Sequence, residues 1–339
     1  MSAQTVLDLC LEYTKPFFTE GYVTQTGSIV LCHKSGKKNA SRLVLDAHLD
    51  TVGFAVSEIC GDGYLRLAPI GGIDANILAS SEVLLLGKEH IRGIFSSIPP
   101  HLSGSDKLPA VGELFVDTGY SDETLKTLVN VGTPVTYYPH FTQLLGDRIS
   151  SVYLDDKICI ACIAECARML ADVSLSSTDV YAYFSSGEER GGNGSFHVYE
   201  EIQPDAAIIL DVNFAKEKGS ADGEYGLLGQ GAMLSVSAVT NMTFTRFIHD
   251  TAEKAGLPIQ PVNEMTYTGT NADVIPKMGL GCASAVLSIP LKYMHSSVET
   301  ADMKDVVTTA EILKEVALEY DKSPICKPVY FKRGGGNLE

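Results

Sequence analysis

Basic side chains are scarce in this sequence, and long apolar runs are absent from it. The 339 residues include 26 Lys and Arg against 42 Asp and Glu, which gives a formal net charge of −16 at pH 7. A surplus of negative charge repels phosphate backbones and anionic lipid surfaces, so neither nucleic acid nor a membrane is an expected partner. No stretch reaches the ~20 apolar residues that span a bilayer, and the first residues lack the features of a signal peptide. We therefore expect a cytoplasmic protein.

The eight cysteines are scattered through a chain that is too long to need a disulfide framework, so reduced thiols are expected. Cys159 and Cys162 form a C-x-x-C pair, but a structural zinc site needs four ligands and no second pair lies nearby in the sequence. With Cys166 they follow helical spacing, which favours packing in the core. The Gly-rich end "RGGGNLE" is interpreted as a tail outside the fold.

Alternating helix and strand patterns indicate an α/β fold. Amphipathic, helix-like patterns occur near residues 3–18, 157–172, 242–256 and 302–320, with short apolar, β-branched runs between them. These runs are "RLVLDAHLD", "DVYAYFSSG", "DAAIILDVN" and "CASAVLSIP". The alternation predicts a mixed sheet flanked by helices on both faces.

Residues 58–148 differ in pattern from the rest of the chain. Short strand-like segments such as "GYLRLAPI" and "SEVLLLG" are separated by Gly, Pro and Ser turns, which is typical of an all-β domain. Because α/β patterns resume after residue 148, we interpret this region as an insertion. The expected organisation is a discontinuous α/β domain of residues 1–57 and 149–339, interrupted by a β domain of residues 58–148.

Imidazole and carboxylate side chains recur where the apolar strands end. His48 and Asp50 in "AHLDTVGF" are two residues apart, so both would leave the same face of a strand, with His48 as a metal ligand and Asp50 or another group as its support. Other strand-like runs end in the same manner. They are "FSSGEERGG" with Glu188 and Glu189, "IILDVNFA" with Asp211 and "LKYMHSSVE" with His295, while "VYLDDKIC" adds Asp155 and Asp156 before a helix.

Each of these segments alone has an ordinary interpretation, as a hydrogen-bonded histidine, a helix cap or a solvated loop. Together they place N and O ligands where open α/β sheets form ligand sites, at the carboxyl ends of strands. Imidazole combined with carboxylate suits zinc, cobalt or manganese better than calcium. If Asp155 bridges, each of two ions has three protein groups and room for a water. The expected ligands are His48, Asp155, Glu189, Asp211 and His295.

The adjacent glutamates Glu188 and Glu189 repel each other unless solvent or a cation offsets their charge. Neighbouring residues of a regular strand point to opposite faces, so both can serve one site only on an irregular turn. We expect Glu189 to bind metal. Glu188 would then act as the general base that takes a proton from a metal-bound water, whose pKa the ion lowers toward ~7.

In the order, type and spacing of these motifs, the chain resembles the M42 family of cocatalytic metallo-aminopeptidases, which includes glutamyl and tetrahedral aminopeptidases. The segments "AHLDTVGF", "LDDK", "GEERGG", "LDVNFA" and "KYMHSSVE" carry the resemblance. It implies a zinc-peptidase-like α/β domain with an inserted barrel-like or PDZ-like domain that serves oligomerisation or substrate access. It also implies that His48 and Asp211 bind one ion, that Glu189 and His295 bind the other, and that Asp155 bridges.

The activity implied by the resemblance is removal of N-terminal residues from short peptides. Metal-bound hydroxide would be the nucleophile, and Glu188 the general base. Two divalent ions per subunit are implied, zinc being expected and cobalt or manganese being alternatives. The implied assembly is a homodimer or a dodecamer.

Three residues depart from the family pattern. Thr51 stands where many members have glutamate, Lys157 replaces the usual arginine, and Asn271 in "GTNADVI" replaces aspartate. These departures leave the expected ligand set complete and the substrate preference open. Arg190 and Asp273 also receive no role from the sequence.

Other classes of protein share part of this pattern. An M20-like deacylase or carboxypeptidase has similar ligands but usually a short gap before the bridging aspartate, whereas here 107 positions separate His48 from Asp155. A metal-free glycosidase needs only two positioned carboxyl groups, such as Glu188 and one other, and would leave His48 and His295 without a role. A non-enzymatic, chaperone-like homologue is the remaining alternative.

Overall fold

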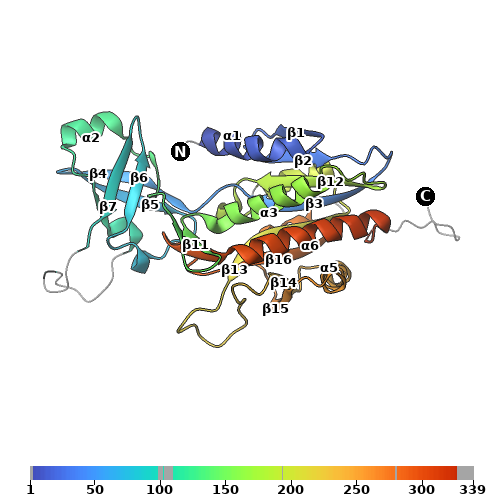
Figure 1. The fold of residues 1–339 in the computed structure, drawn as a ribbon. Coiled ribbons are helices and arrows are strands. Elements are labelled where there is room, and N and C mark those ends of the chain that lie inside the picture. Colours follow the sequence, from blue (N-terminus) through green and yellow to red (C-terminus); the bar gives the residue numbers. More distant parts are fainter. Residues whose placement is uncertain (1–2, 98–101, 103–109, 193, 279–280, 327–339) are drawn as a thin grey trace. The chain divides into compact units, whose positions relative to one another are not determined.

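The computed structural model describes residues 3–97, 102, 110–192, 194–278 and 281–326 (Figure 1). The chain forms two compact units. The barrel unit comprises Met1–Val6, Asp50–Asp155 and Lys292–Ala301, and the sheet unit comprises Leu7–Leu49, Asp156–Leu291 and Asp302–Glu339. The domain boundaries expected from the sequence, at residues 58 and 148, stay a prediction. The Gly-rich tail lies outside the described residues.

An eight-stranded mixed sheet forms the centre of the sheet unit, with the strand order β1-β2-β12-β3-β13-β16-β14-β15. Strand β3 lies between β12 and β13 and runs parallel to both, while β1, β2 and β12 pair antiparallel in succession. The predicted α/β class with a mixed sheet is therefore confirmed. The strands are β1 (Glu20–Val23), β2 (Ile29–His33), β3 (Ser41–His48), β12 (Thr178–Ser185), β13 (Ala206–Phe214), β14 (Ala232–Ser237), β15 (Ile259–Met265) and β16 (Ala283–Leu291).

Helices were expected in four stretches of the sequence, and each of these stretches contains one. The described helices accompanying the sheet are α1 (Ala3–Thr14), α3 (Leu154–Leu170), α4 (Ser195–Ile202), α5 (Met242–Ala255) and α6 (Met303–Lys322). Helices α3 and α6 lie side by side in Figure 1, and the Cys162 thiol donates to the Val306 carbonyl at 3.3 Å. All three cysteines of α3 are fully buried, as expected for core packing.

Both faces of the central strand β3 are covered. Val44 packs on one face with Ile202 of α4, whereas its neighbours Leu43 and Leu45, which point to the opposite face, are 0% and 2% exposed. A strand buried on both faces reads as a nearly continuous apolar run, because no position alternates into solvent. This explains why the segment "RLVLDAHLD" has so few polar residues before its end.

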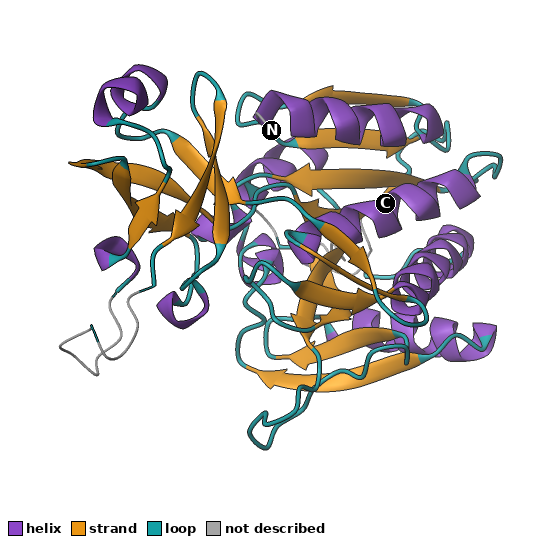
Figure 2. Cartoon of the chain, turned by 60° about the vertical axis from the view of Figure 1, so that its left-hand side comes forward, coloured by secondary structure: helices purple, strands orange, loops and turns teal. Residues whose placement is uncertain are grey.

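A closed antiparallel barrel forms the centre of the barrel unit (Figure 2), and it confirms the expectation of a barrel-like insertion. Alternate residues fill its interior, so β7 shows a strict exposed-buried alternation. Its strands, in the order in which they pair, are β4 (Gly53–Gly61), β5 (Tyr64–Ile70), β8 (Phe115–Asp117), β7 (His90–Phe95), β6 (Glu82–Leu86) and β9 (Pro134–Tyr137). A second, three-stranded sheet has the order β10 (Phe141–Gln143), β11 (Arg148–Ser151) and β17 (Glu299–Asp302).

The interpretation of residues 58–148 as all-β omitted one helix, α2 (Asp122–Leu128). Ser121 caps this helix by accepting the Thr124 N–H, and Asp122 and Glu123 lie at the positive end of the helix dipole. Short 3₁₀ helices complete the structure, namely η1 (Lys15–Phe17), η2 (Ala75–Ile77), η3 (Val111–Glu113), η4 (Glu188–Arg190), η5 (Asn271–Asp273) and η6 (Ile275–Lys277). Among the described residues, no helix combines the length and the apolar character that crossing a membrane requires.

Candidate metal centre

The register of three neighbouring strands brings His48, Ser185 and Asp211 to one level of the sheet. Ser185 at the end of β12 pairs with His48 at the end of β3. On the other side of β3, Asp46 pairs with Ile209 of β13, so His48 and Asp211 lie two residues further along their parallel strands. Parallel strands end at a common edge, and their carboxyl ends form the usual ligand site of an open α/β sheet. Two of the predicted ligands therefore meet because of strand register.

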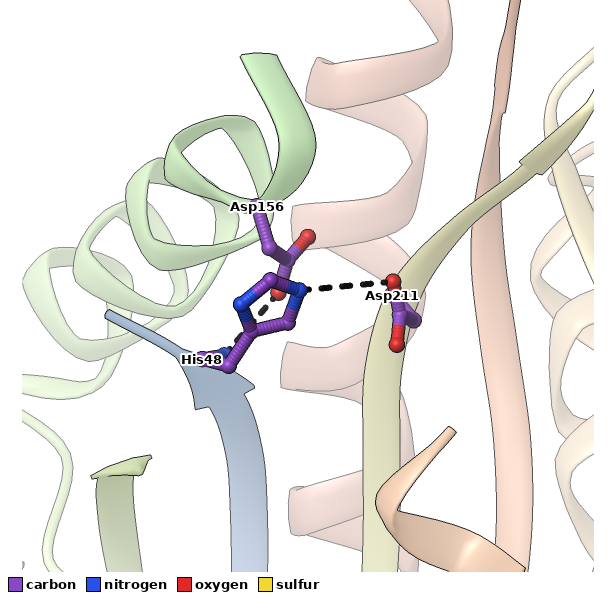
Figure 3. Close-up of side chains that lie close together, drawn as sticks. All are labelled: His48, Asp156 and Asp211. Carbon is purple, nitrogen blue, oxygen red and sulfur yellow. Dashed lines mark hydrogen bonds and ion pairs between the residues drawn. The ribbon is translucent and has the colours of Figure 1, made fainter. Parts of the chain in front are cut away.

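Figure 3 shows His48 and Asp211 together with Asp156 of helix α3, and we call these three residues the strand cluster. The His48 Nε2 atom lies 3.8 Å from the Asp211 Oδ1 atom, and the His48 backbone N–H donates to Asp156 Oδ2 at 3.1 Å. Each of the three side chains offers a ligand atom, and these atoms lie within 4.8 Å of one another. All three residues are at most 6% exposed. The sequence indicated Asp156 only as part of an acidic pair before a helix, and its contact with the end of β3 was missed.

A buried polar network lies next to His48 in the sheet. Asn271 of η5 donates through Nδ2 to Asp46 Oδ2 at 3.0 Å and to Ser185 Oγ at 2.8 Å. Burial raises the pKa of Asp46 to about 7, while the hydrogen bonds from Ser185 and Asn271 oppose this increase. An ionised aspartate at position 271 would lack the N–H donor that makes both contacts. The departure at Asn271 thus has a local structural reason.

Glu188 and Glu189 lie on the irregular turn that the sequence predicted. They form η4, which follows β12, and both side chains are partly exposed. Gly187 precedes them with φ 88°, a conformation that side chains disfavour. A Cβ atom on Gly194 would lie 1.7 Å from the Ser186 carbonyl oxygen, so this position also requires glycine. Glycine is therefore favoured at position 187 by the backbone conformation and at position 194 by close packing.

In the barrel unit, the structure brings together Asp155, His295 and Glu299, which we call the loop cluster. The His295 Nε2 atom lies 3.3 Å from Asp155 Oδ2. The His295 Nδ1 atom lies 2.7 Å from the carbonyl oxygen of Gly72. Since a carbonyl can only accept, we assign the ring proton to Nδ1, which leaves the Nε2 lone pair directed at Asp155. This is the tautomer that a metal-ligating imidazole requires.

Glu299 at the start of β17 holds the backbone of this cluster and was not singled out from the sequence. Its Oε1 atom accepts the His295 N–H at 2.9 Å, and its Oε2 atom accepts the Asp155 N–H at 3.1 Å. Burial raises the pKa of the Glu299 carboxyl to about 8, and the negative charge of Asp155 adds to this increase. Tyr137 of β9 donates its hydroxyl to the His295 carbonyl at 3.2 Å. In the sequence, the only indication of this role is that Glu299 follows His295 by four residues.

The remaining singled-out residues are placed as follows. Asp50 is partly exposed at the start of the barrel unit, and its support of His48 stays a prediction. Lys157 of α3 donates to the Leu49 carbonyl just after β3, so it satisfies a backbone acceptor there. Asp273 accepts the N–H groups of Thr268 and Gly269, which gives it a part in a turn. Arg190 is exposed.

Comparison with known proteins identifies the family. Residues 27–312 match the family model described as M42 glutamyl aminopeptidase. The chain belongs to this family, and the resemblance seen in the sequence is confirmed.

Three similar proteins with aminopeptidase or peptidase names illustrate this assignment. The lysyl aminopeptidase of Pyrococcus furiosus is 32% identical over 321 residues, which cover 93% of this chain and 91% of that protein. Aminopeptidase APDkam598 from Desulfurococcus kamchatkensis superposes with a TM-score of 0.85 at 28% identity, covering 94% of this chain and 90% of that one. The Pyrococcus horikoshii TET1 peptidase is described as assembling into a tetrahedron or a large octahedral shell. It superposes with a TM-score of 0.79 at 26% identity, covering 93% of this chain and 94% of that one.

The family defines the class of reaction. This protein is an aminopeptidase, a hydrolase that acts on the N-terminal peptide bond of its substrates. The family is metal-dependent, and the strand cluster is a candidate metal-binding group. Peptide hydrolysis is therefore favoured over deacylation, glycoside hydrolysis and a non-enzymatic role.

Proposed function

We propose that the protein is a two-metal aminopeptidase that removes N-terminal residues from short peptides. The observation that carries this proposal is that each predicted histidine ligand faces a predicted carboxylate ligand. His48 faces Asp211 at 3.8 Å, and His295 faces Asp155 at 3.3 Å. The proposed ligands are His48, Asp155, Glu189, Asp211 and His295.

Both pairs are suited to a divalent ion. A tetrahedral zinc ion with bonds of about 2.0–2.1 Å to nitrogen and oxygen separates two of its ligand atoms by about 3.3 Å. The separation between His295 and Asp155 in the loop cluster equals this value. The separation between His48 and Asp211 in the strand cluster is wider, but it is still shorter than the summed length of two such bonds. Imidazole and carboxylate donors select zinc, with cobalt and manganese as alternatives.

A single centre that uses both pairs is part of the proposal, as the resemblance to the family implies. Asp155 belongs to the loop cluster and Asp156 to the strand cluster, and one peptide bond joins them at the start of α3. Asp155 is therefore the residue that we assign as the bridging ligand. Glu189, on the turn after β12, would complete the set for the ion that His295 binds.

Two ions bound there would supply a Lewis acid for the scissile carbonyl and lower the pKa of the attacking water toward ~7. Glu188, beside Glu189 on η4, would accept the proton of that water and return it to the leaving amine. Asp50 would orient the imidazole of His48. Short peptides with a free amine are the proposed substrates.

We further propose a homo-oligomer, a dimer or a dodecamer. The Pyrococcus horikoshii relative, which is described as a large shell, supports this assembly. The proposed domain division assigns residues 58–148 to oligomerisation or substrate access and the discontinuous segments 1–57 and 149–339 to catalysis.

The test of the proposed function is the Glu188→Gln variant. We expect it to retain two metal ions per subunit but to lose about 10²–10⁴ of kcat on aminoacyl anilides, because the general base is removed while the ligands remain. Metal content is measured by mass spectrometry of the purified protein. The matched control is Glu165→Gln, on the exposed surface of α3, which should leave both quantities unchanged.

Two results would contradict the proposal. Full activity of Glu188→Gln would remove Glu188 from the mechanism. Activity of the wild-type protein that survives EDTA would remove the metal ions from it.

A further inference from the structure

Glu299 is a buried carboxylate that contacts two separate parts of the proposed metal centre. It is 1% exposed, and its two oxygens accept the N–H groups of Asp155, 144 positions away, and of His295, four positions away. A carboxylate with little access to water is costly unless hydrogen bonds compensate for the lost solvation. Here the two N–H donors belong to Asp155 and His295, whose side chains face each other. A role in stabilising the loop alone would not require donors from two facing residues.

Each of the two N–H groups needs an acceptor. Asp155 is the second residue of α3, and the first N–H groups of a helix have no partner within the helix. His295 has φ 61°, in the left-handed region that non-glycine residues rarely occupy. Such a conformation persists only where the surroundings hold it in place. Glu299 therefore holds a helix start and a strained loop with one side chain.

We propose that Glu299 is a positioning residue that fixes Asp155 and His295 at the separation a metal ion needs, before the ion binds. This inference rests on the proposed function. Gly72 holds the imidazole ring and Tyr137 holds the carbonyl of His295, whereas Glu299 accepts a backbone N–H from each of the two ligands and so connects their backbones. Its loss would leave each ligand present but free to move relative to the other.

The alternative is that Glu299 only stabilises the fold. Asp305 of α6 provides a matched control for this alternative, because it is also a fully buried carboxylate with backbone donors on both oxygens. Its Oδ2 accepts the Gly229 N–H at 2.8 Å, and its Oδ1 accepts the Gly231 N–H at 2.7 Å. Neither donor is a proposed ligand.

The experiment compares Glu299→Gln with Asp305→Asn in the full-length protein. Each substitution replaces an acceptor oxygen by an NH₂ group that faces an N–H donor. Both variants should therefore show a lower thermal unfolding temperature without metal. Zn²⁺ or Co²⁺ is then titrated calorimetrically into each metal-free protein. We expect Glu299→Gln to bind at least one of two ions about 10- to 100-fold less tightly, as for loss of a supporting contact, and Asp305→Asn to bind like wild type.

The outcomes separate the two proposals. Equal metal affinities in Glu299→Gln, Asp305→Asn and wild type would overturn the positioning role while leaving the two-metal proposal intact. A wild-type protein that binds no metal would overturn the proposed function itself. If Glu299→Gln does not fold, Glu299→Asp retains the carboxyl group on a shorter stem that cannot reach both donors. It should then show the same selective loss of affinity and an altered Co²⁺ absorption spectrum, and unchanged values of both would contradict the inference.

Discussion

The strand cluster and the loop cluster each pair a histidine with a carboxylate, but they are positioned in different ways. His48 and Asp211 extend from neighbouring parallel strands, so regular register sets their spacing. His295 lies in a loop with left-handed backbone geometry and faces a residue at the start of a helix. Its position depends on separate hydrogen bonds to its N–H, carbonyl and ring.

This difference shows two ways of positioning the proposed metal ligands. A sheet fixes ligands through the many backbone bonds of its strands, so no single side chain is decisive. A loop fixes a ligand through a few individual bonds, each of which is open to mutation. The strand cluster should therefore respond mainly to changes in its ligands, and the loop cluster also to changes in the residues that hold it.

The largest expected effects come from the ligands themselves. Asp211→Asn should remove one of two ions and lower activity by more than about a hundredfold, a larger loss than removal of a supporting contact causes. Asp155→Asn should weaken both ions, because Asp155 is the proposed bridge. Measurements of metal stoichiometry and of kcat on aminoacyl anilides distinguish the Asp211→Asn variant from the Asp155→Asn variant. Loss of a single ion in Asp155→Asn would show that Asp155 serves the loop cluster alone.

A smaller effect is expected from Asp46, which lies next to the strand cluster. Because its pKa in the folded protein is raised to about 7, folding favours the neutral acid. The resulting stability is fully present below the ordinary pKa of about 4 and is lost as the pH rises through 7. In the wild type, the unfolding free energy should therefore decrease by an amount on the order of a few kcal/mol between pH 4 and pH 8. The Asp46→Asn variant should not show this decrease.

This pH dependence is measured by urea unfolding in EDTA, which keeps metal charge away from Asp46. Asp250→Asn, on the exposed surface of α5, is the control and should leave the pH profile as in wild type. A profile of Asp46→Asn that parallels the wild-type profile would contradict the prediction.

The smallest effect is expected at the loop cluster from Tyr137→Phe, which removes the hydroxyl that donates to the His295 carbonyl. A neutral hydrogen bond contributes about 1 kcal/mol, so metal affinity should fall roughly fivefold. Tyr320→Phe makes the same change at a buried tyrosine that donates to the Ile325 carbonyl, and should cost stability without changing metal affinity. Equal metal affinities in the two variants would show that the His295 carbonyl needs no such support.

In each cluster the sequence proposed a histidine and one carboxylate as ligands, but it missed the contacts of Asp156 in the strand cluster and of Glu299 in the loop cluster. Apolar strands that end in His48 and Asp211 are a local pattern, and parallel strands of a sheet necessarily end near one another. His295 and Asp155 were predicted as ligands, but what holds them was not. Glu299 was missed because a single buried acid gives no periodic signal, and its partner Asp155 is 144 positions away.

Similar reasons explain the other differences. Helix α2 has only seven residues, too few to show a clear helical period among the turns of the barrel unit. Asp46 lies within an apolar strand, and nothing in the sequence connects it with Asn271, which is 225 positions away. These contacts depend on how the chain folds back on itself.

The sequence by itself determined the class of fold, the barrel-like insertion and the types of residue that could bind metal. These follow from local hydrophobic period and from chemistry at strand ends, which a linear chain displays directly. Tertiary structure alone decided which carboxylates face a histidine ring and which accept backbone N–H groups. Asp155, Asp156 and Glu299 are all buried acids, and only the spatial position of their donors and neighbours gives each a different role.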